Sequence, residues 1–343
     1  MIEVLRAGAL TTVQDQGRPG WAHLGVPRSG ALDPAALRLA NRLVGNPEQA
    51  AGLEITLTGC VLRVTRAVTV ALTGAPVDVY VEHPTRPGST TGRPERDPVG
   101  PASARLGPAS ARLGPASARL GPASARPGPR AVAGDAEPPA GRIRRPGDVG
   151  RPLSLPAGAV LRIGPARVGV RTWLAVSGGI AVEPVLGSRS TDTLSGLGPP
   201  PLRDTDRLPL GAPTGPPAPV DLTVGPPVPA EVRLTVRPGP RRDWFTPEAV
   251  DLLCRAAYTV TPASNRVGAR LAGAALPRAV AGELPSEGLV LGAVQVPPDG
   301  QPLVFLADHP TTGGYPVLGV VDDVTPLAQA RPGTTVRFHG PQR

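Results

Sequence analysis

A segment near the C-terminus, residues 306–320, holds residue types that could bind and activate a polar substrate. At its centre, Thr311, Thr312, Gly313 and Gly314 could supply a concave nest of backbone amides together with two hydroxyl groups. Asp308 lies just upstream, and its carboxylate could orient an amide N–H or bind a metal-bound nucleotide. A tight turn at the two glycines is the alternative interpretation, and both stay open at this point.

The same pattern occurs near the N-terminus. Residues 20–26 and 314–320 share a Gly, an aromatic residue, two free positions and Leu-Gly-Val, and an acid lies upstream of each copy, Asp15 in the first and Asp308 in the second. The whole chain has only three Trp and three Tyr, so the matched aromatic positions are notable. We interpret the repeat as two related halves, each with a Gly-rich loop and a nearby carboxylate.

Composition favours strands over long helices. The chain has 343 residues, enough for two domains, and it contains 47 Pro, 43 Gly and only 3% aromatic residues. Pro and Gly interrupt regular elements, and short alternating runs such as 53–57, 61–64 and 68–72 are typical of consecutive antiparallel strands. Asp33 followed by Pro34 predicts a helix start, and a second helix is expected near 247–257. We therefore expect a mainly β fold with a few short helices.

The strong positive charge does not indicate nucleic-acid binding. The net charge is +9 and all 36 basic residues are Arg, but residues 84–150 alone hold 11 Arg against 5 acids, and no aromatic residue lies between Tyr80 and Trp173. The lack of lysine excludes a Walker A loop, a Schiff base and a biotinyl-lysine on this chain. We expect a small-molecule substrate and no nucleic acid.

Metal and membrane sites are not expected either. The four His are dispersed, and Cys60 and Cys254 are isolated, as buried thiols in a reducing compartment would be. The N-terminus lacks a signal-peptide pattern, and no apolar run approaches the roughly 18 residues of a membrane span. We therefore predict a cytoplasmic protein without a metal site or membrane segment.

A repetitive segment interrupts the first half. The heptapeptide PASARLG occurs three times from Pro101, and a fourth copy replaces its Leu with Pro. One Pro and one Gly per heptad are incompatible with a coiled coil, so we predict that 84–150 is a disordered Pro/Gly/Arg-rich insertion. The remaining boundaries expected are 1–83 plus 151–212 for a first subdomain, 213–230 for a linker and 231–343 for a second subdomain.

Ten ordered motifs together resemble the carboxyltransferase subdomain A/B family, which includes the C subunit of ATP-dependent 5-oxoprolinase, the second subunit historically called allophanate hydrolase, the KipA regulator and part of the urea carboxylase region of urea amidolyase. The motifs are TVQDQGRPG (12–20), GVPRSGALDP (25–34), LAN (39–41), VGN (44–46), AVSGGI (175–180), LGSRSTD (186–192), SNRVG (264–268), SEG (286–288), QVPPDGQP (295–302) and DHPTTGGYPVLG (308–319).

The resemblance implies two cyclophilin-like β-barrel subdomains with a cleft between them, named subdomains A and B. It implies two partners, the 5-oxoprolinase B subunit, of the carboxyltransferase C/D type, and the A subunit. It also implies ATP, with Mg, as the co-substrate for opening 5-oxo-L-proline to L-glutamate. Two alternatives remain open. One is a biotin-dependent carboxyltransferase half that acts on a urea-like amide and uses biotin on a separate carrier. The other is a KipA-type regulator that neutralises a kinase inhibitor.

Activating a lactam requires hydrogen-bond donors and cations around the carbonyl. For this chemistry we predict Asp308 and Arg266 as catalytic residues, Arg266 offering a fork for a carboxylate or phosphate. The residues predicted to bind substrate or nucleotide are Asn265, Ser286, Glu287, Gln295, Thr311, Thr312, Gly313, Gly314, Asp15 and Arg18. Structural roles are the alternatives: Asn265 and Arg266 could brace a barrel loop, Asp15 could shape a turn, and Ser286–Gly288 could be a turn or a substrate contact.

Overall fold

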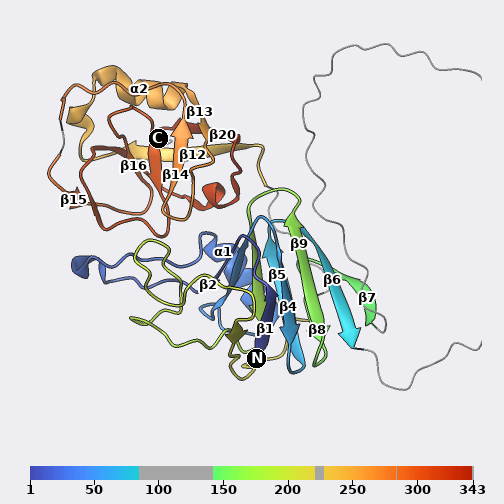
Figure 1. Ribbon diagram of the computed structural model, residues 1–343. Coiled ribbons are helices and arrows are strands. Elements are labelled where there is room, and N and C mark those ends of the chain that lie inside the picture. The colour runs from blue at the N-terminus through green and yellow to red at the C-terminus, as the bar shows by residue number, and fades with distance from the viewer. Residues whose placement is uncertain (85–141, 221–227, 283, 342–343) are drawn as a thin grey trace, which may run out of the picture. The chain divides into compact units, whose positions relative to one another are not determined.

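The computed structural model describes residues 1–84, 142–220, 228–282 and 284–341, and these form a mainly β structure with a few short helices, as expected (Figure 1). The helices of the described residues are α1 (Pro34–Leu43), α2 (Pro247–Arg255) and three short 3-10 turns, η1 (Ala22–Leu24), η2 (Arg242–Trp244) and η3 (Thr325–Gln329).

Two antiparallel sheets share one apolar core in the first half of the chain. The strands are β1 (Ile2–Arg6), β2 (Leu10–Gln14), β3 (Gly52–Thr56), β4 (Cys60–Val64), β5 (Val68–Gly74), β6 (Val77–Pro84), β7 (Arg142–Gly147), β8 (Pro152–Leu155), β9 (Val160–Ala166), β10 (Arg171–Val176) and β11 (Arg207–Leu208). One sheet has the order β11-β1-β4-β9-β6-β7 and the other β2-β3-β10-β5-β8. Leu53, Leu62 and Leu161 are among the fully buried side chains of their common core.

Helix α1 packs on β5 and β10 of the five-stranded sheet and begins as the sequence predicts. The Asp33 carboxylate accepts a hydrogen bond from the Ala36 N–H at 2.9 Å, and Pro34 occupies the first helical position, where its missing N–H costs nothing. Ala40 and Leu43 then face Ala71 and Ala175 of the sheet. The small residues allow the helix to lie close to the strands.

The predicted insertion, 84–150, extends too far at its C-terminal end. Residues 142–147 form β7, which pairs antiparallel with β6 from Val79 to Pro84. The sequence of β7 lacks an apolar alternation and contains Pro146, but β7 is the last strand of its sheet, where a Pro is tolerated. The heptapeptide repeats and most of the predicted insertion fall in 85–141, outside the described residues, as does 221–227 of the predicted linker.

A closed barrel forms in the second half of the chain, in the strand order β12-β19-β16-β17-β14-β13-β20. Its strands are β12 (Glu231–Pro238), β13 (Ala257–Val260), β14 (Gly268–Ala272), β16 (Ala293–Gln295), β17 (Leu303–Phe305), β19 (Val317–Val321) and β20 (Thr335–His339). Only β12 and β20 pair in parallel, and this pair closes the ring.

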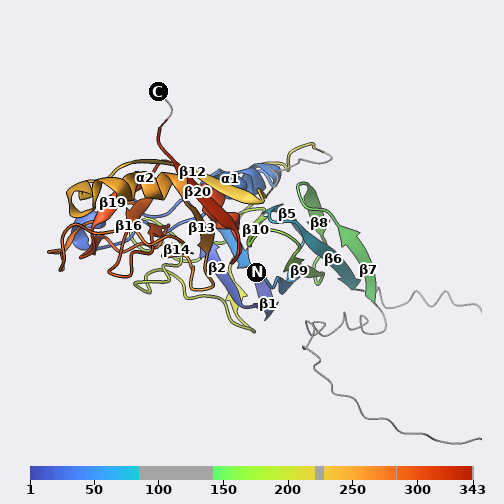
Figure 2. The ribbon, with the colours of Figure 1, turned by 90° about the horizontal axis from the view of Figure 1, so that it is seen from above.

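Helix α2 covers one side of the barrel and lies beside β20 (Figure 2). Its Ala249 and Leu253 are buried with Tyr258 and Phe338, whose rings meet edge to face at 5.9 Å. A separate two-stranded ladder joins β15 (Glu287–Gly288) to β18 (Thr312–Gly313). Within the described ranges, neither α-helix nor any 3-10 turn has the length and apolar character needed to cross a bilayer.

Candidate functional site

A buried ionic network is centred on Arg266, one of the two residues predicted as catalytic. Its side chain is 1% exposed and forms a two-pronged pair with Asp308, since Nε and Nη2 each lie 2.9 Å from a carboxylate oxygen. Nη1 contacts both oxygens of Glu54 at 2.7 Å, and Nη2 also donates to the Gly30 carbonyl at 2.6 Å. The planar guanidinium therefore engages two carboxylates at once, which a lysine could not do with the same geometry.

A second buried arginine completes this network. Arg171 donates from Nε to Glu54 at 3.1 Å and from Nη1 to the Ala328 carbonyl at 2.6 Å. Burial lowers the pKa of Arg171, and the nearby Glu54 charge opposes this shift. Burial alone would also lower the pKa of Arg266, but Glu54 and Asp308 together raise it above its ordinary value. Both arginines therefore remain charged and offset the buried carboxylates.

The network joins the two halves of the chain. Glu54 and Arg171 come from β3 and β10 of the first half, whereas Arg266 and Asp308 come from loops of the barrel half. Asp308 is fully buried, and besides Arg266 it accepts hydrogen bonds from the Thr193 N–H at 3.0 Å and the Thr193 hydroxyl at 2.6 Å. A carboxylate with this burial and these partners has no surface on which to touch a substrate. The geometry favours a positioning role for Asp308 and Arg266.

Asp15 holds the loop that also reaches Asp308. Its carboxylate accepts hydrogen bonds from the hydroxyls of Ser188 and Ser190 and from the Arg189 N–H, each at 2.6 Å. It also accepts from the Gly17 N–H at 2.8 Å, which shapes the local turn. Since Thr193 binds Asp308, the segment 188–193 lies anchored by one acid at each end.

Arg18 is buried beside this segment. The side chain is 1% exposed, and it donates from Nη2 to the Ser190 carbonyl and from Nε to the Val185 carbonyl. Burial lowers the pKa of Arg18, and this effect outweighs the opposite influence of Asp192, Asp15 and Asp308. Its Nη1 has no hydrogen-bond partner in the part of the chain that the structure describes.

The Thr311–Gly314 segment is extended. Thr312 and Gly313 form β18, which pairs with Glu287 and Gly288 of β15. Successive N–H groups of an extended strand point in opposite directions, so the predicted concave amide nest does not form at these two residues. The glycine at 313 is required by packing: an added Cβ would lie 2.8 Å from Leu289 Cδ1. The predicted tight turn is therefore not the reason for this glycine.

The remaining predicted residues surround this ladder or lie apart from it. Gln295 donates from its side chain to the Tyr315 carbonyl at 3.0 Å, and Glu287 forms an ion pair with Arg241, which lowers the pKa of Glu287. Ser286 is exposed. Asn265 accepts from the Val267 N–H at 2.8 Å, so it braces its own loop, as the structural alternative supposed.

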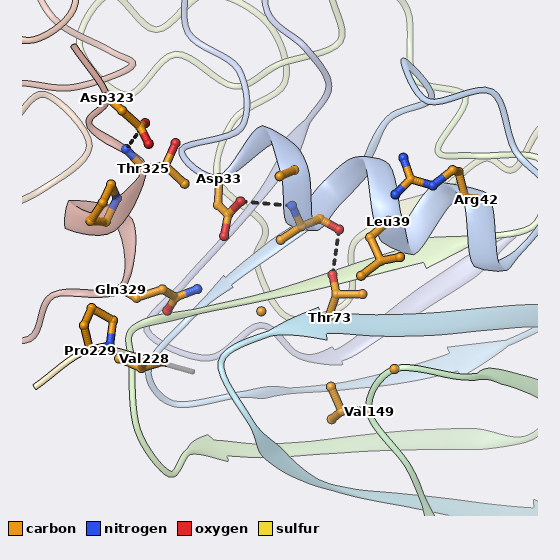
Figure 3. Close-up of a pocket in the computed structure, with 15 residues that line it drawn as sticks. Asp33, Leu39, Arg42, Thr73, Val149, Val228, Pro229, Asp323, Thr325 and Gln329 are labelled. Atoms are coloured by element: carbon orange, nitrogen blue, oxygen red, sulfur yellow. Dashed lines mark hydrogen bonds between the residues drawn. The ribbon is translucent and has the colours of Figure 1, made fainter. Parts of the chain in front are cut away.

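Two cavities lie close to the ionic network. The larger, of about 410 Å³, lies between α1 and η3 (Figure 3). Asp33, Asp323 and Thr325 lie toward one end in the figure and Arg42 toward the other, while Leu39, Val149 and Val228 make much of the wall apolar. Burial raises the pKa of Asp33, and the negative charges of Glu54 and Asp323 add to this effect.

The smaller cavity, of about 130 Å³, shares Asp323 and Thr325 with the larger one and also receives Ser29 and His309. Neither Ser29 nor His309 was predicted as a site residue, although both lie inside recognised motifs. Glu54 was also missed, although a carboxylate within the apolar run of 53–57 was a usable signal. Across the described ranges, no group of three His, Cys, Asp or Glu side chains could hold a metal ion.

The sequence matches a family model described as carboxyltransferase domain, subdomain A and B, over residues 24–95 and 128–340. The stretch left unmatched, 96–127, contains most of the heptapeptide repeats. The C subunit of 5-oxoprolinase from Escherichia coli K12 is 34% identical over 98% of this chain and 90% of its own length.

Solved structures show the same relationship. The structure of TTHA0988 has a TM-score of 0.73 at 33% identity, and it covers 98% of this chain but 55% of its own. The urea amidolyase of K. lactis has a TM-score of 0.73 at 25% identity and covers 99% of this chain but 19% of its own. This chain therefore spans about half of the first structure and a fifth of the second. By sequence and by fold, it belongs to the carboxyltransferase domain family, subdomains A and B.

Proposed function

We propose that this chain is the C subunit of an ATP-dependent 5-oxoprolinase, which opens 5-oxo-L-proline to L-glutamate together with the A and B subunits. The observation that carries the proposal is the 34% identity to the Escherichia coli C subunit, over 98% of this chain and 90% of that relative. A match that runs over nearly the full length of both proteins favours the same place in the same assembly.

The reaction is difficult because a lactam is stabilised by resonance between its nitrogen and its carbonyl group. An enzyme must place a donor at the carbonyl oxygen and a proton acceptor at the nitrogen before the bond can be activated. We propose that this chain contributes to holding the lactam, and that the buried Glu54–Arg266–Asp308 network keeps the surrounding loops in place.

The described residues do not fit ATP on this chain alone. The small cavity is about 130 Å³, and the larger one presents Asp33 and Asp323, whose carboxylates would repel phosphates. The extended Thr312–Gly313 strand offers no nest for a phosphate. We therefore propose that ATP and its Mg ion are held mainly by the partner subunits, in a cytoplasmic complex.

The test is ATP-dependent release of L-glutamate from 5-oxo-L-proline by the purified chain combined with the A and B subunits of the same organism. We expect release only when all three proteins and ATP are present. Mixtures that lack this chain or ATP serve as controls. A folded, assembled mixture that releases no glutamate would overturn the proposal.

A urea-directed carboxyltransferase half is the second candidate, because the urea amidolyase structure has the same fold over 99% of this chain. The chain would then need biotin on a separate carrier, since it contains no lysine to carry one. Carboxylation of urea by the chain with its partner and a biotinylated carrier, without glutamate release in the first assay, would favour this candidate.

A further inference from the structure

The smaller cavity contains a polar pair that the proposed function has not used. It has a volume of about 130 Å³ and lies against the ionic network, because Leu32 in its wall donates its N–H to Glu54 at 3.4 Å and Ala307 precedes Asp308. Water takes up about 30 Å³ per molecule in the liquid, so this volume corresponds to about four waters. The cavity can hold a small polar group and excludes a nucleotide.

Ser29 places an unpaired hydroxyl at this cavity. Its side chain is 3% exposed, and its Oγ makes no hydrogen bond within the described part of the chain. An unmade hydrogen bond of a buried polar group costs about 1–3 kcal/mol. Ser29 therefore keeps a donor that packing alone would have removed or paired.

The backbone of Ser29 is also strained. Its φ is 52°, in the left-handed region that non-glycine residues rarely adopt. The conformation is held by neighbours: the Ser29 N–H donates to the Ala307 carbonyl at 3.0 Å, and a Cβ added to the adjacent Gly30 would lie 2.7 Å from the Gly17 nitrogen. Strain and an unsatisfied hydroxyl in one residue are typical of a functional position.

His309 places an acceptor at the same cavity. Its Nδ1 lies 2.7 Å from the Pro310 carbonyl, which can only accept, so Nδ1 carries the hydrogen. In the neutral ring Nε2 then has a free lone pair, and among the described residues it has no hydrogen-bond partner. The ring is 7% exposed, and burial lowers its pKa, although the Pro310 carbonyl and the Asp308 charge act in the opposite direction. The imidazole is therefore neutral at pH 7.

The charged groups around the cavity do not satisfy this pair. Arg28, Asp322 and Asp323 contribute to its wall. Asp322 is paired with Arg237 at 2.6 and 3.1 Å, and Asp323 accepts from the Thr325 N–H at 2.8 Å, as Figure 3 also shows. Arg28 is exposed at the rim. The free hydrogen-bonding groups inside are one hydroxyl donor and one imidazole acceptor.

We infer that this cavity receives the cis-amide edge of the substrate, with the Ser29 hydroxyl donating to the carbonyl oxygen and His309 Nε2 accepting from the N–H. A lactam, like urea, presents its C=O and N–H on one side, whereas a trans amide presents them on opposite sides. Two groups in one small cavity match the cis arrangement. The inference rests on the proposed function for the identity of the lactam, 5-oxo-L-proline.

The pairing also gives His309 a place in the chemistry. When the carbonyl oxygen becomes the nucleophile, the electron pair of the N–H bond moves into the C–N bond and the oxygen takes up the negative charge. The proton passes to Nε2, which becomes the N–H of an imidazolium. Ser29 stabilises the developing oxygen charge by the hydrogen bond it already donates.

Binding is tested by NMR on the imidazole nitrogens of the 15N-labelled full chain, alone and with its partner subunits. The chain has only four His, so the His309 signals can be assigned with His309→Gln. We expect saturable shifts of His309 with 5-oxo-L-proline and with 2-pyrrolidinone, but none with the trans amide N-methylacetamide. His339, an unrelated histidine at the end of β20, serves as the internal control.

Ser29→Gly removes the hydroxyl and suits the positive φ, so it should fold and yet weaken lactam binding about tenfold, which corresponds to about 1.4 kcal/mol. Ser29→Ala is the companion variant that keeps the strain. Lactams that leave His309 unshifted in both samples, equal saturation by N-methylacetamide, or unchanged affinity in Ser29→Gly would each overturn the inference.

Turnover by the assembled complex separates this inference from the proposed function. His309→Gln should lower kcat at least about 100-fold, and the fall of wild-type activity toward acid pH should disappear in it. His339→Gln should match the wild type. If lactams bind at His309 but the wild-type complex makes no glutamate, the function fails and the cavity assignment stands. Glutamate formation with an unchanged His309→Gln rate and pH profile would overturn the assignment alone.

Discussion

The two copies of the repeated pattern, residues 20–26 and 314–320, have different structures. The first forms the exposed turn η1, and the second leads into β19 of the closed barrel. The equivalent leucines differ accordingly, since Leu24 is 61% exposed and Leu318 is 2% exposed. Seven matching positions thus do not determine local structure, because pairing with distant strands decides which copy becomes extended.

What the copies share is their relation to one loop. Asp15, upstream of the first copy, binds Ser188 and Ser190, and Asp308, upstream of the second, binds Thr193. The copies also approach each other, since a Cβ added to Gly25 would lie 3.9 Å from the Thr311 hydroxyl. The similarity therefore concerns position around segment 188–193, and the two carboxylates differ in how they are paired: Asp308 by a buried arginine, Asp15 by neutral donors.

The largest expected effect follows from that difference. Arg266→Gln should lower the free energy of unfolding by about 3–5 kcal/mol, because Glu54 and Asp308 would remain buried without their common cation. Arg237→Gln is the matched control: its pair with Asp322 is exposed, so the expected loss is about 0–1 kcal/mol. Urea unfolding followed by Trp fluorescence measures both. Equal losses in the two variants would show that the network does not hold the halves together.

Identical substitutions in the two copies give the next effect. Leu318→Ala should cost about 2–5 kcal/mol, because it leaves a cavity in the barrel core, whereas Leu24→Ala should change stability by less than about 0.5 kcal/mol. The same urea titration compares them. A large loss in Leu24→Ala would mean that the first copy is packed more tightly than its exposure indicates.

Local features of the fold could be predicted from the sequence, but the long-range pairs could not. The start of α1 depends only on Asp33, Pro34 and Ala36, which are neighbours in the chain. The contact between Glu54 and Arg266 spans 212 positions, and no single sequence shows it. Arg266 and Asp308 were identified as important from their motifs, but their burial and mutual pairing appear only once the barrel is closed.

The errors have similar causes. The strand β7 has no apolar alternation to detect, because its pairing with β6 comes from backbone hydrogen bonds at a sheet edge. Gly313 was predicted to form a turn or an amide nest, but the space around it is limited by Leu289 and Gln295, which come from a different part of the barrel. Ser29 and His309 were not predicted because their significance is a missing partner, and a missing partner is visible only in three dimensions.

Asp15→Ala tests the neutral pairing of the first acid. It should lower stability by about 1–3 kcal/mol, since the buried hydroxyls of Ser188 and Ser190 would lose their acceptor, and the Arg189 amide should exchange faster with solvent. Asp299→Ala is the control, because Asp299 accepts from the N–H two residues on, as Asp15 does, but in an exposed loop. Unchanged exchange at Arg189 would contradict the anchoring role of Asp15.

The smallest effect separates the acceptor role of a carboxylate from its charge. Asp33→Ala should cost about 1 kcal/mol by removing the cap of α1, whereas Asp33→Asn keeps an acceptor for the Ala36 N–H. The pKa of Asp33 is raised in the folded state by burial and by Glu54 and Asp323, so wild-type stability should fall as pH rises from the unfolded pKa, about 3.9, through the higher folded value. The asparagine variant cannot ionise, so its stability relative to the wild type should increase over the same interval, as measured by urea unfolding at several pH values. If that relative stability instead decreased with rising pH, the Asp33 carboxylate would be stabilised by its surroundings, and the crowding of negative charge at this end of the cavity would be wrong.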